Sequence, residues 1–207
     1  MNTNQRKRHW NKIYKSNNSD NLSWFQLVPE TSLRIIEDLN LSPDAHIMDV
    51  GGGDSYLTDH LIRSGFSNLS VLDVSEEALA LLRERHSRLS EKVDYLVSDI
   101  LDFEPASKVD LWHDRATLHF LTTDDEVSRY IDKVEKSVKP GGYVIIGVFS
   151  AAGPNKCSGI EIRQYDEESM KNLLAEDFQI IRSFRIDHLT PSQKTQNFIF
   201  TVFRKQA

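Results

Sequence analysis

The sequence predicts an α/β fold built on a doubly wound, mostly parallel β-sheet. The first observation is an apolar run over residues 46–50, typical of a strand buried on both faces, that leads directly into three glycines. The second is helical spacing of apolar residues after the glycines, followed by another short strand over 69–72. The third is two alternating stretches late in the chain, 178–184 and 198–203, without a helix between them. These two stretches indicate an antiparallel pair at the edge of the sheet.

Cap and breaker residues give the order of the elements in the first half. We expect a helix from Pro29 or Glu30 to before Pro43, the strand over 46–50, a helix closed by Gly65, the strand over 69–72, a helix capped by Ser75, and a strand over 93–97. On the helix after Ser75 we expect a buried apolar stripe formed by Leu79, Leu82 and Leu89. Outside this stripe we expect a solvated face formed by Arg83, Arg85 and Arg88.

The second half continues the alternation of strands and helices. We expect a strand over 109–112, a helix that starts at Thr123-Asp124-Asp125-Glu126, a strand over 143–149, a helix that begins at Asp166, and the two late strands. The loop over 150–159 follows the carboxyl end of a strand, where loops commonly shape a substrate pocket. Cys157 lies in this loop, and we interpret it as a quiet small residue.

Composition restricts the classes of protein that remain. A chain of 207 residues with 39% hydrophobic and 27% charged residues has room for one complete α/β core. Its net charge of −6 argues against a nucleic-acid partner, and no apolar run is long enough for a membrane span. The polar N-terminus does not resemble a secretory signal, and its Arg6-Lys7-Arg8 cluster is interpreted as a solvated, frayed end.

One cysteine excludes an internal disulfide and suits a reducing compartment. Four cysteine or histidine ligands at zinc spacing are absent, so no metal is expected. We therefore expect a cytoplasmic protein, monomeric or homodimeric, without a membrane partner.

The glycine turn over 51–53 indicates which kind of ligand the sheet binds. A dinucleotide fingerprint needs a third glycine that would fall on Tyr56, Leu57 or Thr58, and a Walker loop needs a lysine that is absent. Asp49 instead stands two residues before the first glycine, where a carboxylate would repel a pyrophosphate and attract a cation. S-adenosylmethionine carries an α-ammonium and a sulfonium, so the turn fits this cofactor better than NAD.

Five motifs in order carry a resemblance to the class I S-adenosylmethionine-dependent methyltransferases. They are Asp49-Val50-Gly51-Gly52-Gly53, Val71-Leu72-Asp73-Val74-Ser75, Ser98-Asp99-Ile100, Val109-Asp110-Leu111, and Lys139-Pro140-Gly141-Gly142-Tyr143. The resemblance covers residues 30–203 and implies a Rossmann-like sheet of seven strands, with an antiparallel final strand, in a three-layer αβα sandwich. The chain departs from the family where Asp54-Ser55 stands in place of the turn's last glycine.

The resemblance also implies roles for individual residues. Asp49 would lie near the methionine ammonium, the glycines Gly51 and Gly53 would pack under the cofactor, Asp73 would bind the ribose hydroxyls, and Asp99 would meet the adenine amino group. The cofactor-binding set that we carry over is Asp49, Gly51, Gly53, Asp73, Val74, Asp99, Ile100 and Asp114. The product would be S-adenosylhomocysteine.

Residues 113–120 are the candidate methyl-transfer segment. They resemble the Asp-Lys-Gly-Thr-Leu-Asp segment of certain protein lysine methyltransferases and the Asp-Arg-Gly-Ala-Leu segment of thiopurine methyltransferases, both at the transfer site. Asp114, Arg115 and His119 are therefore the candidate catalytic residues: Asp114 to orient the acceptor or take its proton, Arg115 to hold an anionic acceptor or structure the loop, and His119 as a base. The alternative reading is an Asp–Arg pair that only fixes the loop and a histidine that is only packed.

Three functions remain open. The first is a methyltransferase that acts on a small thiol, amine or oxygen nucleophile by direct displacement. The second is a protein lysine methyltransferase, against which Arg115, Ala116 and His119 depart from the expected residues. The third is a non-catalytic S-adenosylmethionine-binding sensor or partner subunit. The methyl acceptor is thus a small molecule or a protein.

Residues 1–28 are expected to form an aromatic lead-in to a single methyltransferase domain over 29–207. The lead-in contains Trp10, Tyr14, Trp24 and Phe25. Such aromatics bury large areas, either to cap the sheet edge or to fold over the cofactor as a lid, and both readings stay open.

Overall fold

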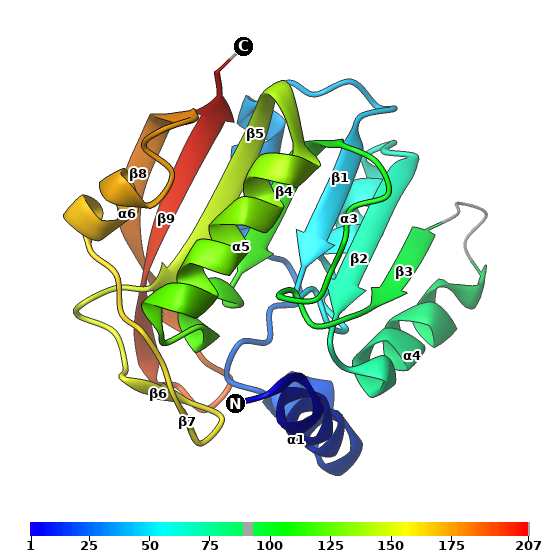
Figure 1. Cartoon of the computed structure of the whole chain (residues 1–207). Coiled ribbons are helices and arrows are strands. Elements are labelled where there is room, and N and C mark those ends of the chain that lie inside the picture. Colours follow the sequence, from blue (N-terminus) through cyan, green and yellow to red (C-terminus); the bar gives the residue numbers. More distant parts are fainter. Residues whose placement is uncertain (89–92, 207) are drawn as a thin grey trace. The chain divides into compact units, whose positions relative to one another are not determined.

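The computed structural model describes residues 1–88 and 93–206. The chain divides into two compact units, residues 1–100 and the residues from 101 onward, which are described separately. Within the described residues the main sheet has seven strands in the order β3-β2-β1-β4-β5-β9-β8. The predicted fold class, a mostly parallel seven-stranded sheet with an antiparallel final strand and flanking helices, is confirmed (Figure 1).

In its described residues, the first unit contains three parallel strands and four α-helices. Its elements are α1 (Thr3–Ser16), the short helix η1 (Ser19–Asn21), α2 (Glu30–Asp38), β1 (His46–Val50), α3 (Leu57–Arg63), β2 (Asn68–Asp73), α4 (Glu76–Arg85), η2 (His86–Arg88) and β3 (Val93–Val97). β2 pairs with β1 on one side and β3 on the other, both in parallel. α4 packs against β2 and β3, and α1 packs against α4 at the end where these strands finish (Figure 1).

Local chemistry explains the boundaries of these helices. The Ser75 hydroxyl accepts a hydrogen bond from Ala78 N at 3.2 Å, which confirms the predicted cap of α4. Gly65 ends α3 with φ +91°, a left-handed conformation that glycine adopts without strain. α1 was not predicted as a helix. It begins with a reciprocal capping box between Asn2 and Gln5.

The second unit carries the other strands. Its elements are β4 (Val109–Arg115), η3 (Leu118–Phe120), α5 (Asp124–Ser137), β5 (Val138–Phe149), the two-residue strands β6 (Lys156–Cys157) and β7 (Ile160–Glu161), α6 (Glu167–Leu173), β8 (Phe178–Leu189) and β9 (Thr195–Lys205). β5 pairs with β4 in parallel and with β9 antiparallel, and β8 completes the antiparallel edge that the sequence predicted.

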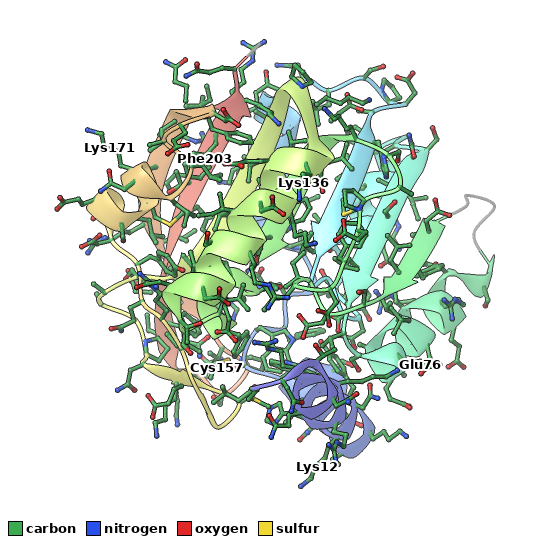
Figure 2. The ribbon with its side chains drawn as sticks, viewed as in Figure 1. Lys12, Glu76, Lys136, Cys157, Lys171 and Phe203 are labelled. Carbon is green, nitrogen blue, oxygen red and sulfur yellow. The ribbon has the colours of Figure 1, made fainter. Side chains whose placement is uncertain are left out.

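Capping boxes at Thr123 and Asp166 start α5 and α6 as predicted. α5 packs on β4 and β5, while Lys136 and Lys171 extend from the outer faces of α5 and α6 (Figure 2). Phe203, on β9, is buried in the core.

Several predicted boundaries differ from the structure. β4 does not end at residue 112 but continues to Arg115, so the start of the candidate transfer segment is strand rather than loop. β5 already begins at Val138, and Cys157 lies in a hairpin that was not predicted. Leu79 and Leu82 are buried as expected, whereas Leu89 lies outside the described residues. No helix in residues 1–88 and 93–206 is long and apolar enough to cross a bilayer.

Candidate cofactor and acceptor site

The glycine turn after β1 is shaped so closely that side chains have no room. Gly53 has φ +55°, and a Cβ built there would overlap the Tyr14 hydroxyl. A Cβ on Gly52 would lie 2.6 Å from Asp49 Oδ2. The turn is tied to the neighbouring strand because Gly51 N donates to Leu72 O at 2.7 Å. Three consecutive glycines therefore let the backbone pass between the Asp49 carboxylate and a helix of the N-terminal segment.

Three carboxyl groups gather around this turn. Asp73 is buried, and its Oδ1 accepts a hydrogen bond from Ser75 N at 2.7 Å. Burial raises the pKa of Asp73 to about 7, in spite of hydrogen bonds from the backbone of Ser75 and Gly53. The charges of Asp49 and Asp54 contribute to the same rise in pKa. The turn is thus surrounded by buried carboxyl groups, which suits a cationic ligand.

Asp99 forms an ion pair with Arg6 of α1. Its buried carboxylate accepts a hydrogen bond from Arg6 Nη1 at 3.0 Å, and the Arg6 side chain is only 12% exposed. The interpretation of the Arg6-Lys7-Arg8 cluster as a solvated, frayed end is therefore wrong for Arg6. Its helix carries it onto the acid that the resemblance assigns to the adenine amino group.

One face of α1 lies along the ends of the three strands. Arg6, Trp10 and Tyr14 recur every four residues, so they share a helix face. Tyr14 is buried, and burial, followed by the charge of Asp73, raises its pKa well above the usual value. Asn11 Oδ1 accepts a hydrogen bond from the Ser75 hydroxyl at 2.8 Å. Lys12, by contrast, projects away from the strands (Figure 2).

The aromatic lead-in packs inside the first unit. Trp10 and Tyr14 both make edge-to-face contacts with Trp24, at 5.7 and 6.4 Å between ring centroids. Phe25 contacts Tyr56 in the same way at 6.0 Å. These contacts join the lead-in to the glycine turn and to α4, where Ala78 is part of the same cluster.

The structure brings together the predicted cofactor residues of the first unit. Asp49, Asp73 and Asp99 stand at or just beyond the carboxyl ends of β1, β2 and β3. Ser98 N donates to Asp73 O at 3.0 Å, so the ends of β2 and β3 are hydrogen-bonded. Ile100 is buried and Val74 is half-buried beside these acids in the chain. Ligands bind at this end of strands in open parallel sheets.

In the second unit, Asp114 is fully buried on β4. Its carboxylate accepts hydrogen bonds from the Tyr130 hydroxyl at 2.7 Å, Thr117 N at 2.8 Å and Leu118 N at 3.1 Å. Burial raises the pKa of Asp114 to about 6, against the opposing effect of these donors. Trp112 Nε1 donates to the Tyr130 hydroxyl at 3.0 Å, which fixes Tyr130 in turn.

The residues after Asp114 form a strained connection. Ala116 has φ +79°, a left-handed conformation that favours glycine, and both resembling segments carry glycine at this position. Arg115 lies before it, with Cζ 5.3 Å from the ring centroid of Phe198. Strain of this kind is found mainly where the surrounding structure holds a functional segment in place.

His119 is a packed histidine on a short helical turn, as one of the two readings predicted. Its ring stacks on Phe149 with 4.6 Å between centroids, and Nδ1 accepts a hydrogen bond from Phe149 N at 3.4 Å. Burial lowers the pKa of His119 to about 3, so the ring is neutral. Among the described residues, neither His119 Nε2 nor the buried Tyr165 hydroxyl has a hydrogen-bond partner.

Residues 47–142 match a family model described as a methyltransferase domain. These residues therefore form a methyltransferase domain. The resemblance to class I S-adenosylmethionine-dependent methyltransferases that the five motifs indicated is therefore confirmed, and S-adenosylmethionine is the cofactor that this family implies.

The fold of the chain resembles solved structures along nearly its whole length. The N-methyltransferase NodS from Bradyrhizobium japonicum, solved with S-adenosylhomocysteine, has a TM-score of 0.72 and 19% identity, with 98% of this chain and 100% of NodS covered. A 1,6-didemethyltoxoflavin-N1-methyltransferase from Burkholderia thailandensis has a TM-score of 0.70 and 18% identity. The match covers 99% of this chain and 85% of that enzyme. At these identities the likeness concerns the fold.

By sequence, the chain is similar to an eEF1A lysine and N-terminal methyltransferase from Mus musculus. The identity is 24% over 153 residues, which are 69% of this chain and 21% of that protein. The chain thus spans about a fifth of the length of this relative.

The residues of the first unit fit the cofactor of the methyltransferase domain. A Cβ at Gly52 or Gly53 would overlap Asp49 or Tyr14, respectively, so the turn needs glycine at both positions. Buried carboxyl groups at Asp49 and Asp73 flank it and supply acceptors for an ammonium group and for hydroxyls.

We predict that the affinity for S-adenosylhomocysteine rises with pH through about 7. The folded, ligand-free chain holds a proton on Asp73 below that pH, whereas ribose hydroxyls donate best to the ionised carboxylate, so binding must release the proton. At pH 6 the dissociation constant should be up to about tenfold larger than at pH 8. The measurement is calorimetric titration in buffers of different ionisation enthalpy.

The Asp73→Asn variant is the control, because it removes the titration and keeps the shape. It should bind more weakly than the wild type, with little dependence on pH. A wild-type affinity that is flat between pH 6 and 8 would contradict the assignment of Asp73 to the ribose.

Proposed function

We propose that this chain transfers a methyl group from S-adenosylmethionine to a nucleophilic atom of a small molecule by direct displacement. The cofactor supplies an electrophilic methyl group on a sulfonium, which leaves as a neutral thioether. The protein then has to align the reacting atoms and, for an amine or hydroxyl acceptor, remove one proton.

The roles in the first unit follow from its charges. We assign Asp49 to the ammonium of the methionine tail, because a buried carboxylate under the glycine turn favours a cation. Asp73 would accept hydrogen bonds from ribose hydroxyls. Asp99, now paired with Arg6, would meet the adenine amino group, while Val74 and Ile100 would line the adenosine.

Asp114 is our choice for the group that orients the acceptor or takes its proton. Its pKa of about 6 makes it ionised at neutral pH yet more basic than an exposed aspartate, which suits a general base. His119 is a weaker choice as a base, because its neutral ring resists protonation, but Nε2–H is available to donate a hydrogen bond. Arg115 would hold an anionic group of the acceptor or fix the loop.

We base the choice of a small acceptor on the cover that α1 provides. Arg6, Asn11 and Tyr14 contact the strand ends that carry the cofactor acids, so the lead-in over 1–28 acts as a lid in this proposal. A lid of this kind encloses a small acceptor more readily than a folded protein surface. The likeness in fold to a methyltransferase that acts on didemethyltoxoflavin supports the same class.

A protein lysine acceptor is the second candidate. It is favoured by the sequence match to an eEF1A lysine and N-terminal methyltransferase, although that match covers only 21% of the relative. The Gly-Gly-Gly-Asp-Ser turn and the segment from Asp114 to Leu118 also resemble lysine methyltransferases.

We predict that methyl-labelled S-adenosylmethionine, incubated with the protein and a fractionated lysate, will label the small-molecule fraction. A heat-inactivated sample and Asp73→Asn serve as controls. Label in macromolecules would replace our proposal with the protein-acceptor reading. Label in neither fraction, with S-adenosylhomocysteine still bound, would indicate a non-catalytic sensor.

We further predict that Asp114→Asn lowers turnover at least tenfold while the dissociation constant for S-adenosylhomocysteine changes less than threefold. Tyr130→Phe is the matched control, because it removes one donor to Asp114 and keeps the carboxylate. This control should retain most of its turnover in initial-rate assays. Equal losses in the two variants would mean that Asp114 acts only through the loop that it holds.

A further inference from the structure

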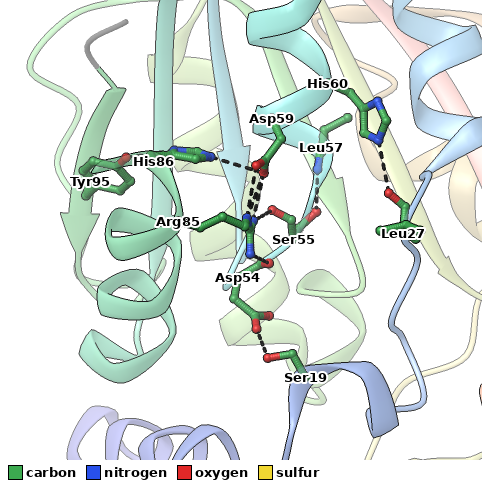
Figure 3. A network of polar contacts seen from close by, with 10 residues as sticks. All are labelled: Ser19, Leu27, Asp54, Ser55, Leu57, Asp59, His60, Arg85, His86 and Tyr95. Carbon is green, nitrogen blue, oxygen red and sulfur yellow. Dashed lines mark hydrogen bonds and ion pairs between the residues drawn. The ribbon is translucent and has the colours of Figure 1, made fainter. Parts of the chain in front are cut away.

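Arg85, at the end of α4, holds the far end of the glycine turn. Nη1 donates to Asp54 O at 2.9 Å and Nη2 donates to Ser55 O at 2.6 Å (Figure 3). Its guanidinium also lies over the Tyr56 ring, with Cζ 4.0 Å from the centroid. A single side chain therefore contacts three consecutive residues. The expectation that Arg85 belongs to a solvated face is wrong.

The same guanidinium is anchored on α3. Nε and Nη2 donate to the Asp59 carboxylate at 3.1 and 2.9 Å, a two-point contact that arginine makes and lysine cannot reproduce. Asp59 is buried, and burial acts to raise its pKa. The contacts with His86 and Arg85 outweigh burial and lower the pKa of Asp59 to about 2, so the acid stays ionised.

His86 and Tyr95 complete the anchor. His86 Nε2 lies 3.2 Å from Asp59 Oδ2, and His86 Nδ1 lies 2.9 Å from the Tyr95 hydroxyl. Asp59 is thus held from two sides, by Arg85 and by His86 (Figure 3). The position of the guanidinium is therefore set by α3, α4 and β3 together.

The contacts to Asp54 and Ser55 fix the shape of the turn. Because a peptide group is planar, a hydrogen bond to the Asp54 carbonyl also orients the N–H of Ser55. That N–H donates to Gly52 O at 2.9 Å and closes the turn. The Asp54 side chain accepts a hydrogen bond from Ser19, which secures the turn on the side of the lead-in. These contacts stand where the family commonly has a further glycine.

We propose that Arg85 is a positioning residue for the cofactor: it holds Asp54 and Ser55 so that the glycine turn keeps the shape that binds S-adenosylmethionine. The inference rests on the assignment of the turn to the cofactor. Arg85 would act through the backbone of the turn and would not touch the cofactor itself.

The test compares the dissociation constant for S-adenosylhomocysteine, measured by calorimetry well below the melting temperature, in three variants. Arg85→Met should raise it about tenfold or more, since the polar contacts to the turn are lost. Arg85→Lys keeps the positive charge but loses the two-point hydrogen bonding of the guanidinium, so it should give an intermediate dissociation constant. Arg83→Met is the matched control. Arg83 lies on the same helix over Tyr95, 4.8 Å from its centroid, so the constant should stay within twofold.

Arg85→Met leaves Asp59 buried without its main partner, so the double variant Arg85→Met, Asp59→Asn is measured beside it. A purely structural role would lower the melting temperature and leave the dissociation constant of the folded protein unchanged, and that result would overturn the proposal. Weak binding by the folded double variant, with the partial rescue by lysine, would support it. If the wild type itself failed to bind S-adenosylhomocysteine, the proposed function would fail instead.

Discussion

The crowding of carboxyl groups around one glycine turn is the constraint on which the first unit depends. Burial raises the pKa of Asp73 to about 7, and the charges of the neighbouring Asp49 and Asp54 contribute to this rise. Buried like charges destabilise a fold unless donors or cations offset them. The chain offsets them with backbone N–H groups, with Ser19 and with the Arg85 guanidinium near Asp54. A ligand that brings its own positive charge relieves the same repulsion.

Electrostatics also connects the N-terminal helix to the cofactor acids. Arg6 pairs with Asp99, and Tyr14 lies over Gly53 beside Asp73. α1 is thereby coupled to the charge state of the site, since any ligand that takes Asp99 competes with Arg6. In the second unit, hydrogen-bond donors likewise offset a buried carboxylate, since three donors surround Asp114.

The sequence predicted the parts of the site that depend on strand ends. Asp49 and Asp73 follow buried apolar runs, and their positions in parallel strands bring them to one edge of the sheet. It also predicted Ser75 and Thr123 as caps, because capping is local. Arg85 and Arg6 could not be found in this way, since their partners lie about 30 and 93 residues away in the chain. For Arg6, the four-residue spacing to Trp10 and then Tyr14 could have indicated that the three side chains share one helix face. The extension of β4 to Arg115 reflects pairing with β5, which local pattern does not reveal.

The most direct test of the account is a pair of calorimetric titrations of the purified chain, one with S-adenosylhomocysteine and one with NADH. A turn lined by Asp49 and Asp73 should bind the ligand with an ammonium group and reject the one with a pyrophosphate, so we expect heat of binding only in the first titration. Binding of NADH without binding of S-adenosylhomocysteine would contradict the central claim.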